Sequence, residues 1–228
     1  MPFLIEEYFK IKQELNPSQT QLIAVSKTKP NEDILEAYNA GVRDFGENYV
    51  QELIDKQSAL PKDIHWHFIG HLQSNKVKYI APFVNLIHGV DSEKLLLEIN
   101  KQGQKKGRKI NCLLQVHIAK EESKFGFNEE ELNSLIQKYF SSSPSNNIKL
   151  DFINIQGLMG MATFTHDNSV IESEFLYLKV IFDKIQTFKG SNFNPVILSM
   201  GMSSDYLLAI KNGSNMVRIG SMLFGNRN

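Results

Sequence analysis

The chain has 228 residues, 42% of them hydrophobic, and its 25 basic residues balance its 25 acidic residues. This length suffices for one buried core of the size found in α/β barrels. A neutral chain lacks the basic excess typical of proteins that bind nucleic acid or an anionic membrane surface. With a single cysteine, Cys112, it cannot form an internal disulfide, which is typical of a reducing compartment.

Residues 1–15 predict an amphipathic helix with acidic residues near its start. A signal peptide would instead combine a basic start with an unbroken apolar run. No apolar stretch of the sequence approaches the length of a membrane span. We therefore expect a cytoplasmic protein with no membrane partner.

Beyond this helix, short apolar runs alternate with amphipathic segments. The runs predict strands at 22–28, 42–48, 65–70, 86–91, 110–118, 155–162, 195–202 and 217–225. The amphipathic segments predict helices at 32–41, 49–60, 92–102, 129–140, 169–186 and 204–213. We expect helix N-caps at Asn31, Asp91 or Ser92, Asn128 and Ser203, and helix ends at Gly41 and Gly213.

The alternation of strands with helices predicts a parallel sheet that is buried on both faces. Eight such units favour a closed (β/α)₈ TIM barrel preceded by the extra N-terminal helix. The alternative is an open doubly wound sheet, which would carry a glycine-rich phosphate loop after its first strand, where residues 27–30 read KTKP. The polar connector 141–147 is too short to divide domains, so we expect one domain over residues 1–228.

Lys27 lies where the first strand ends. In a (β/α)₈ barrel the functional groups lie at the carboxyl ends of the strands. Because side chains alternate along a strand, Lys27 shares a face with Ile23 and Val25 and is expected to point inward. Partial burial favours the neutral amine, which is the form that attacks a carbonyl. The alternative is an ordinary lysine whose ammonium reaches solvent.

Arg218 and Gly220 share the inward face of the last strand. A buried arginine needs an acceptor. That acceptor is either an acidic loop residue in a structural ion pair or a ligand atom, such as a ring nitrogen or a phosphate oxygen. Gly220 would let a ligand approach the backbone closely.

Small residues follow the seventh and eighth strands: Ser199, Gly201, Ser203, Ser204, Gly220 and Ser221. Barrel enzymes often bind phosphate with these two loops. An amine, an arginine and a phosphate loop at one barrel end predict a ligand with an aldehyde and a phosphate. Pyridoxal 5'-phosphate (PLP) carries both groups and a ring nitrogen.

Six segments of the chain also resemble the YggS/PROSC family of PLP homeostasis proteins. They are AVSKTKP (24–30), FGENYVQE (45–52), WHFIGHLQSNKVK (66–78), GLMGMA (157–162), LSMGMSSD (198–205) and VRIGSMLFG (217–225). The resemblance implies a fold-type III PLP barrel, similar to the N-terminal domain of alanine racemase. It implies that Lys27 holds PLP as a Schiff base and that Arg218 faces the pyridine nitrogen. It also implies that the phosphate is held by the segments of Ser199, Ser203, Gly220 and Ser221, and that Asn48 belongs to the pocket.

The expected site lacks the features of a PLP enzyme. An acidic residue beside the ring nitrogen strengthens the electron sink, whereas an arginine weakens it, which racemases tolerate. The racemases that this barrel resembles complete the site with a tyrosine from a second domain, and Tyr49, Tyr79 and Tyr206 are not obvious replacements. We therefore expect a PLP carrier or regulator, not an enzyme. It would be a monomer whose partners are PLP and apo PLP-dependent enzymes. The alternatives are a PLP-dependent amino-acid racemase or lyase, and a Schiff-base aldolase for a sugar phosphate.

Five further residues with reactive or ionisable side chains are not part of the expected PLP site. Lys124, after the fifth strand, is either a mobile cation that helps PLP enter and leave or a solvated lysine. His65, His67 and His71 are expected to pack and form hydrogen bonds, without a metal. Cys112 lies within an apolar strand, where a buried, unreactive thiol is expected.

Overall fold

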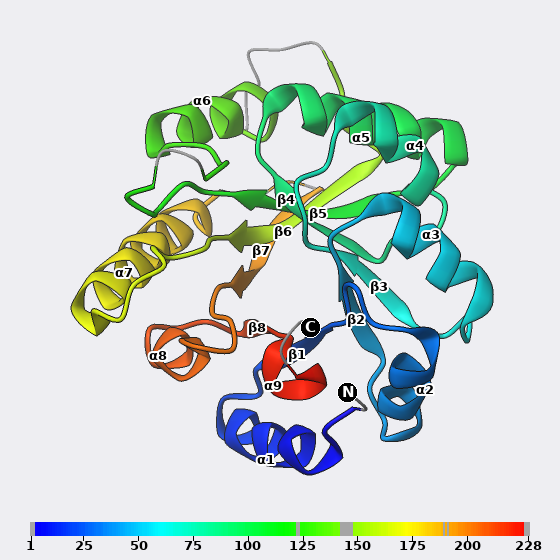
Figure 1. The fold of residues 1–228 in the computed structure, drawn as a ribbon. Coiled ribbons are helices and arrows are strands. Elements are labelled where there is room, and N and C mark those ends of the chain that lie inside the picture. Colours follow the sequence, from blue (N-terminus) through cyan, green and yellow to red (C-terminus); the bar gives the residue numbers. More distant parts are fainter. Residues whose placement is uncertain (1–2, 122–123, 142–147, 189, 191, 226–228) are drawn as a thin grey trace.

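Eight parallel strands close into a barrel in which each strand pairs with the next along the chain (Figure 1). They are β1 (Gln21–Val25), β2 (Asp44–Glu47), β3 (His65–Phe68), β4 (Leu86–Val90), β5 (Ile110–Gln115), β6 (Ile153–Met159), β7 (Phe193–Ser199) and β8 (Met216–Ile219). The computed structural model describes residues 3–121, 124–141, 148–188, 190 and 192–225. Most of the predicted connector, residues 142–147, lies outside the described residues. The predicted (β/α)₈ barrel is confirmed.

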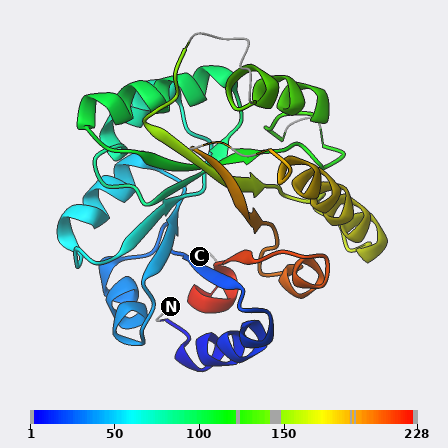
Figure 2. The ribbon, with the colours of Figure 1, turned by 180° about the vertical axis from the view of Figure 1, so that it is seen from behind.

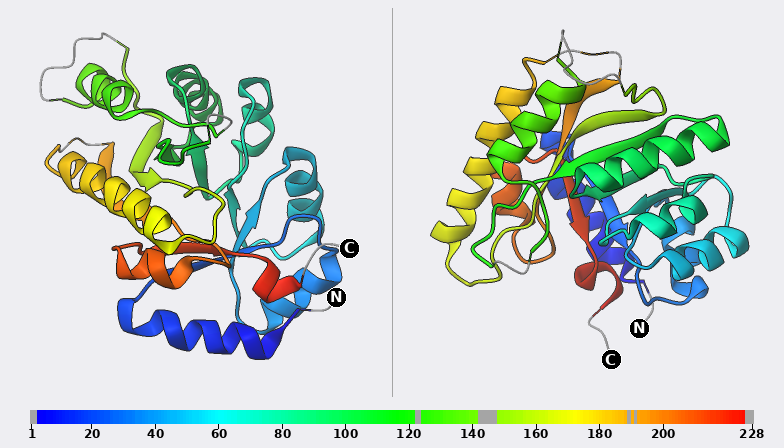
Figure 3. Two further views of the ribbon diagram at one scale, coloured as in Figure 1. Left: turned by 60° about the vertical axis from the view of Figure 1, so that its left-hand side comes forward. Right: turned by 90° about the horizontal axis from the view of Figure 1, so that it is seen from above.

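Helices cover the outside of the barrel on every side that Figures 1 to 3 show. They are α1 (Ile5–Leu15), α2 (Asn31–Asn39), α3 (Val50–Ala59), α4 (Val77–Ile80), α5 (Glu93–Lys106), α6 (Glu129–Tyr139), α7 (Asn168–Ile185), α8 (Tyr206–Lys211) and α9 (Ser221–Phe224). Two 3₁₀ turns, η1 (Asn16–Ser18) and η2 (Ser74–Lys76), precede β1 and α4. None of the described helices is long and apolar enough to cross a membrane.

Two of the expected N-caps are confirmed. Ser92 accepts a hydrogen bond from the backbone in the first turn of α5, and Asn128 forms a full capping box at the start of α6. Two expectations are wrong. Asn31 is itself the first residue of α2, and Ser203 lies three residues before α8, where its hydroxyl accepts a hydrogen bond from the backbone N–H of Gly220.

Two elements differ from the sequence prediction. The strand predicted at 217–225 ends at Ile219, because the backbone turns at Gly220 and the next four residues form α9. The N–H groups of Leu223 and Phe224 both donate to the carbonyl of Gly220, which closes this helical turn. Between β3 and β4 the chain forms η2 and α4, where no helix is predicted. A four-residue helix is too short to show a clear hydrophobic period.

The barrel interior has an apolar layer followed by a polar one. Five strands contribute its apolar cluster: Ile23, Leu86, Leu113, Met159 and Met216. Two residues further along three of these strands come buried polar side chains: His88, Gln115 and Arg218. Because side chains alternate along a strand, both layers face inward. The predicted inward direction of Ile23 and Arg218 is confirmed.

Helix α1 completes the helical layer beside β1, between α2 and α8 (Figures 1 and 2). At its start, the backbone N–H of Phe3 donates to Glu36 of α2. Near its end, the hydroxyl of Tyr206 in α8 donates to Glu14. Ile11, on its inner face, is fully buried. The helix after β8, α9, has four residues, so α1 covers barrel surface that α9 is too short to reach.

Candidate functional site

A cavity of about 530 Å³ opens where six strands end, at the carboxyl end of the barrel. Its lining consists of Val25, Lys27, Lys29, Asn48, Ile69, Met161, Phe164, Met202, Ser203, Ser204, Arg218, Gly220, Ser221 and Gly225. Among the described residues that line it, three are cations, three are serines and none is acidic. This lining suits an anionic ligand with hydrogen-bond acceptors.

The structure brings six of the seven predicted site residues together around this cavity: Lys27, Asn48, Ser203, Arg218, Gly220 and Ser221. Lys27 is half-buried and lies in the turn after β1, which ends at Val25. The next residue, Thr28, has a left-handed backbone (φ +63°), and its N–H donates to Glu52 Oε1 at 2.5 Å. The turn therefore holds a backbone conformation that is uncommon for a β-branched residue.

A buried charged cluster lies beneath this turn. Lys56 Nζ donates to the Ser26 carbonyl at 2.7 Å, to Glu47 Oε1 at 2.8 Å and to Glu52 Oε1 at 2.6 Å. The Ser26 hydroxyl donates to the same Glu47 oxygen at 2.6 Å. Burial raises the pKa of Glu47 to about 7, against the opposing effect of the Lys56 charge. These contacts tie β2 and α3 to the residue that precedes Lys27.

This buried cluster is not predicted from the sequence. Its one local signal is the i,i+4 spacing of Glu52 and Lys56 on α3, which predicts an ion pair on a helix surface. The contact between Lys56 and Glu47 depends on how α3 packs against β2 and is not visible in the spacing.

Arg218 is buried and its guanidinium is held by acceptors that carry no charge. Nη1 donates to the carbonyl of Ser199 at 3.0 Å and to its hydroxyl at 2.7 Å, and Nη2 donates to the Gly160 carbonyl at 3.1 Å. Burial lowers the pKa of Arg218 to about 10, although the charge of Asp205 opposes this shift. Arg218 therefore stays protonated at neutral pH. Among the described residues no carboxylate forms an ion pair with Arg218. The acceptor of this arginine is therefore not an acidic loop residue in the described part of the chain.

Ser199 is the predicted site residue that the structure does not bring to the cavity. It is fully buried and lies behind Arg218, within 3.4 Å of His88 Nδ1. We expected it among the phosphate-binding segments. Because β7 extends to residue 199, this side chain still belongs to the barrel interior, and the loop that lines the cavity begins after it.

The loops after β7 and β8 meet at one side of the cavity. The N–H of Gly220 donates to the Ser203 hydroxyl at 3.3 Å, and Ser204 and Ser221 complete the serine lining. A Cβ atom at residue 220 would lie 3.2 Å from the Cβ of Val25. A larger residue would therefore press against Val25, and glycine lets the end of β8 pack closely against β1.

Asn48 lines the cavity and carries a buried side-chain oxygen that lacks a partner among the described residues. Its Oδ1 is buried and has no hydrogen-bond partner within the described part of the chain. A buried amide oxygen without a partner is costly. It therefore marks a position where a donor group of a ligand, or a water molecule, would be stabilised.

Lys124 does not line the cavity. Its ammonium donates to the Ala162 carbonyl at 2.5 Å and lies 3.2 Å from a carboxylate oxygen of Glu121. These contacts link the loop after β5 to the loop after β6. The suggested role of Lys124 in PLP entry stays a hypothesis.

The three tyrosines considered above are not part of the cavity lining either. Tyr49 and Tyr79 are exposed, and Tyr206 is buried with its hydroxyl bonded to Glu14 of α1.

The histidines form hydrogen bonds, as expected. His71 Nδ1 lies 2.8 Å from Asp91 and its ring stacks on Phe125, whereas His65 and His67 both contact Asp44. Among the described residues, no group of three or more histidine, cysteine or acidic side chains could hold a metal ion.

Comparison with known proteins places the chain among characterised relatives. A family model described as alanine racemase, N-terminal domain, matches residues 4–228. A protein of Schizosaccharomyces pombe named pyridoxal phosphate homeostasis protein is 39% identical over 220 residues, and the match covers 96% of this chain and 89% of that protein. A human protein of the same name is 38% identical over 225 residues, which covers 94% of this chain and 79% of the human one.

Solved structures agree with these sequence matches. PipY of Synechococcus elongatus PCC7942, solved with PLP bound, has a TM-score of 0.82 at 35% identity, covering 97% of this chain and 99% of PipY. Alanine racemase from Bartonella henselae has a TM-score of 0.69 at 18% identity, covering 95% of this chain and 56% of the racemase. The likeness to the racemase shows the fold alone.

Proposed function

The chain belongs to the alanine racemase N-terminal domain family and, within it, to the pyridoxal phosphate homeostasis proteins, and on this premise we propose that it binds PLP covalently through Lys27 and acts in PLP homeostasis. In this role it is a carrier or regulator of PLP and not a catalyst. The observation that carries the proposal is one cavity that combines an amine, a buried guanidinium and three serines, without an acidic residue among the described residues of its lining.

The donor set of this cavity fits PLP. The serines and the cations offer donors to a phosphate, and the Oδ1 of Asn48 offers an acceptor that lacks a partner within the described residues. When bound, PLP supplies an aldehyde that an amine can attack and a ring that withdraws electrons. We propose that Ser203, Gly220 and Ser221 hold the phosphate.

The roles of Lys27 and Arg218 follow from their chemistry. The Lys27 amine would attack the aldehyde carbon, and the aldehyde oxygen would leave as water. Arg218 donates hydrogen bonds but does not give up a proton at neutral pH, because its pKa stays near 10 even when buried. It would therefore bind the ring nitrogen without protonating it, which keeps the ring a weak electron sink. A weak electron sink supports the carrier role over the lyase alternative, whereas a racemase tolerates it.

We also infer the partners, the oligomeric state and the cellular compartment of the protein. We propose a cytoplasmic monomer with one domain over residues 1–228 that passes PLP to apo PLP-dependent enzymes. The closure of the barrel by β1 and β8 and the position of α1 beside them support the single domain. The one cysteine, buried in β5, is consistent with a reducing compartment.

Reduction with borohydride tests the covalent attachment. After incubation with PLP and reduction, we expect peptide mass analysis of the wild-type protein to find a pyridoxyl group on Lys27. The variant Lys27→Ala should lose this label. Lys29→Ala is the matched control, because Lys29 lines the same cavity two residues away, and this variant should keep the label on Lys27. A label on Lys29 alone, or none on the wild type, would contradict the proposal.

Amino-acid turnover separates a carrier from an enzyme. We expect the purified protein with bound PLP to show no steady racemisation or elimination with any of the common amino acids. Sustained turnover would favour the racemase or lyase.

A further inference from the structure

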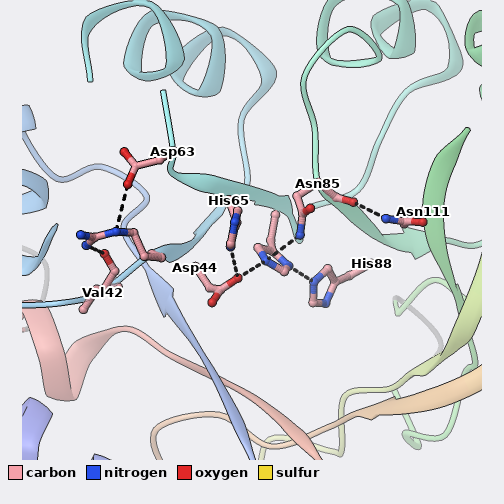
Figure 4. A network of polar contacts seen from close by, with 9 residues as sticks. Val42, Asp44, Asp63, His65, Asn85, His88 and Asn111 are labelled. Atoms are coloured by element: carbon pink, nitrogen blue, oxygen red, sulfur yellow. Dashed lines mark hydrogen bonds and ion pairs between the residues drawn. The ribbon is translucent and has the colours of Figure 1, made fainter. Parts of the chain in front are cut away.

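Buried polar side chains form a row inside the barrel, starting at the amino end of β2 (Figure 4). Asp44 Oδ1 lies 3.0 Å from His67 Nε2, and His67 Nδ1 lies 3.0 Å from His88 Nε2. Both histidines are at least 99% buried, on β3 and β4. The row continues beyond the figure from His88 Nδ1 to the Ser199 hydroxyl at 3.4 Å, and from that hydroxyl to Arg218 Nη1 at 2.7 Å.

The chemistry of the two ends gives this row a direction. The carboxylate of Asp44 only accepts hydrogen bonds, and the guanidinium of Arg218 only donates them. Burial raises the pKa of Asp44, but its hydrogen bond with His67 and its contact with His65 lower it, and the pKa stays below its usual value. A carboxylate at Asp44 accepts from His67 Nε2. In the neutral imidazole, which our proposal requires at His67, Nδ1 is then an acceptor.

The donors and acceptors of the remaining residues in the row follow from this assignment. His88 Nε2 must donate to His67, so His88 Nδ1 is an acceptor for the Ser199 hydroxyl, and the oxygen of that hydroxyl accepts from Arg218. Burial, with the positive charge of Arg218, lowers the pKa of His88 well below its usual range, so His88 stays neutral. A neutral imidazole has the one donor and the one acceptor that this position requires.

A further contact to the row is weaker. Asn85 Nδ2 lies 3.5 Å from His67 Nε2 and so competes weakly with the shorter contact to Asp44.

Ser199, the last residue of the row before Arg218, contacts the guanidinium from within the barrel interior. Nη1 donates both its N–H groups to Ser199, and Nη2 donates one N–H group to the Gly160 carbonyl. The remaining Nη2 and Nε hydrogens have no acceptor among the described residues, and Arg218 lines the cavity.

We propose that His67 and His88 are positioning residues that, through Ser199, hold Arg218 in the orientation in which it meets the ring nitrogen of PLP. The inference rests on the proposed function. It gives Ser199 a part in the site other than phosphate binding.

The hydrogen-bond direction can be measured without PLP. Nitrogen-15 NMR of the histidine side chains should find the neutral Nε2–H tautomer for both His67 and His88 at pH 7. An Nδ1–H tautomer at His88, or a charged His67, would overturn the proposal, because His88 could not then accept from Ser199.

Two substitutions at one position test the effect on the cofactor. His88→Asn places an amide oxygen close to the position of Nδ1 and can still accept from Ser199, whereas His88→Gln extends to the Nε2 position and leaves Ser199 without its acceptor. We expect His88→Gln to bind PLP about tenfold more weakly, as for the loss of one internal hydrogen bond, and to shift the absorbance maximum of the bound cofactor. His88→Asn should stay within about threefold of the wild type.

His65→Asn is the control, because exposed His65 contacts the same Asp44 oxygen at 3.2 Å but is not part of the row. It should leave both the affinity and the absorbance unchanged. If His88→Gln matches the wild type in both, the positioning role is overturned while the proposed function stands. If the wild type itself fails to bind PLP, the proposed function is overturned.

Discussion

At the residue scale, the buried carboxylate of Glu47 couples the stability of the protein to pH. Its pKa is about 7 in the folded protein, against 4.5 for an ordinary glutamate, because burial disfavours the charged form. The folded protein therefore binds more protons than the unfolded chain between these two values. The resulting stabilisation is fully present below about pH 4.5 and is lost as the pH rises through about 7.

We predict that Glu47→Gln weakens this pH dependence. Glutamine is neutral, so urea unfolding at pH 5, 6 and 7.5 should show a smaller decline in the free energy of unfolding than the wild type shows. The difference in decline should be up to about 3 kcal/mol, since one pKa unit corresponds to about 1.4 kcal/mol. Glu52→Gln serves as the control, because Glu52 contacts the same Lys56 from a more exposed position. Equal declines for Glu47→Gln and the wild type would contradict the prediction.

At the scale of single elements, α6 depends on its N-terminal cap. Asn128 Oδ1 accepts from the N–H of Glu131 at 2.8 Å, and the Glu131 carboxylate accepts from the N–H of Asn128 at 3.0 Å. Asn128→Ala should therefore lower the free energy of unfolding by about 1 kcal/mol, measured from the urea midpoint. Asn133→Ala, at an exposed position within the same helix, should be neutral or slightly stabilising. Equal effects of the two substitutions would show that the capping box does not contribute.

At the scale of the whole molecule, α1 joins the two ends of the described chain. The N–H of Leu4 donates to the carbonyl of Leu223 at 2.8 Å, and the rings of Phe3 and Phe224 pack with centroids 5.4 Å apart. The barrel closure between β1 and β8 thus lies beneath a helix that precedes both strands in the sequence.

We predict that Ile11→Ala lowers the free energy of unfolding by about 2–4 kcal/mol, because the side chain is fully buried and its loss leaves a cavity. Ile5→Ala on the same helix removes a side chain that is 49% exposed and should change stability by less than about 0.5 kcal/mol. Thermal and urea unfolding would measure both. If Ile11→Ala behaves like Ile5→Ala, α1 is not part of the cooperative fold.

The sequence alone determined the order of the eight strands and the fold class, since a two-residue or 3.6-residue period is visible within a strand or a longer helix. The same local rule predicted that Ile23 and Arg218 point into the barrel. Local signals also located the caps at Ser92 and Asn128. They failed at residues 217–225, where an apolar run continues through Gly220 into α9.

The tertiary structure decided which polar groups meet. His67 and His88 are 21 residues apart, and Ser199 lies 111 residues from His88. Lys56 reaches Glu47 from a different element. Such contacts depend on the register of the strands and on barrel closure, which bring residues from opposite walls into one interior. Local patterns carry no information on that register. Lys27 and Arg218 could therefore be proposed from the sequence, whereas the row behind Arg218 and the cluster beneath Lys27 became visible only in the folded barrel.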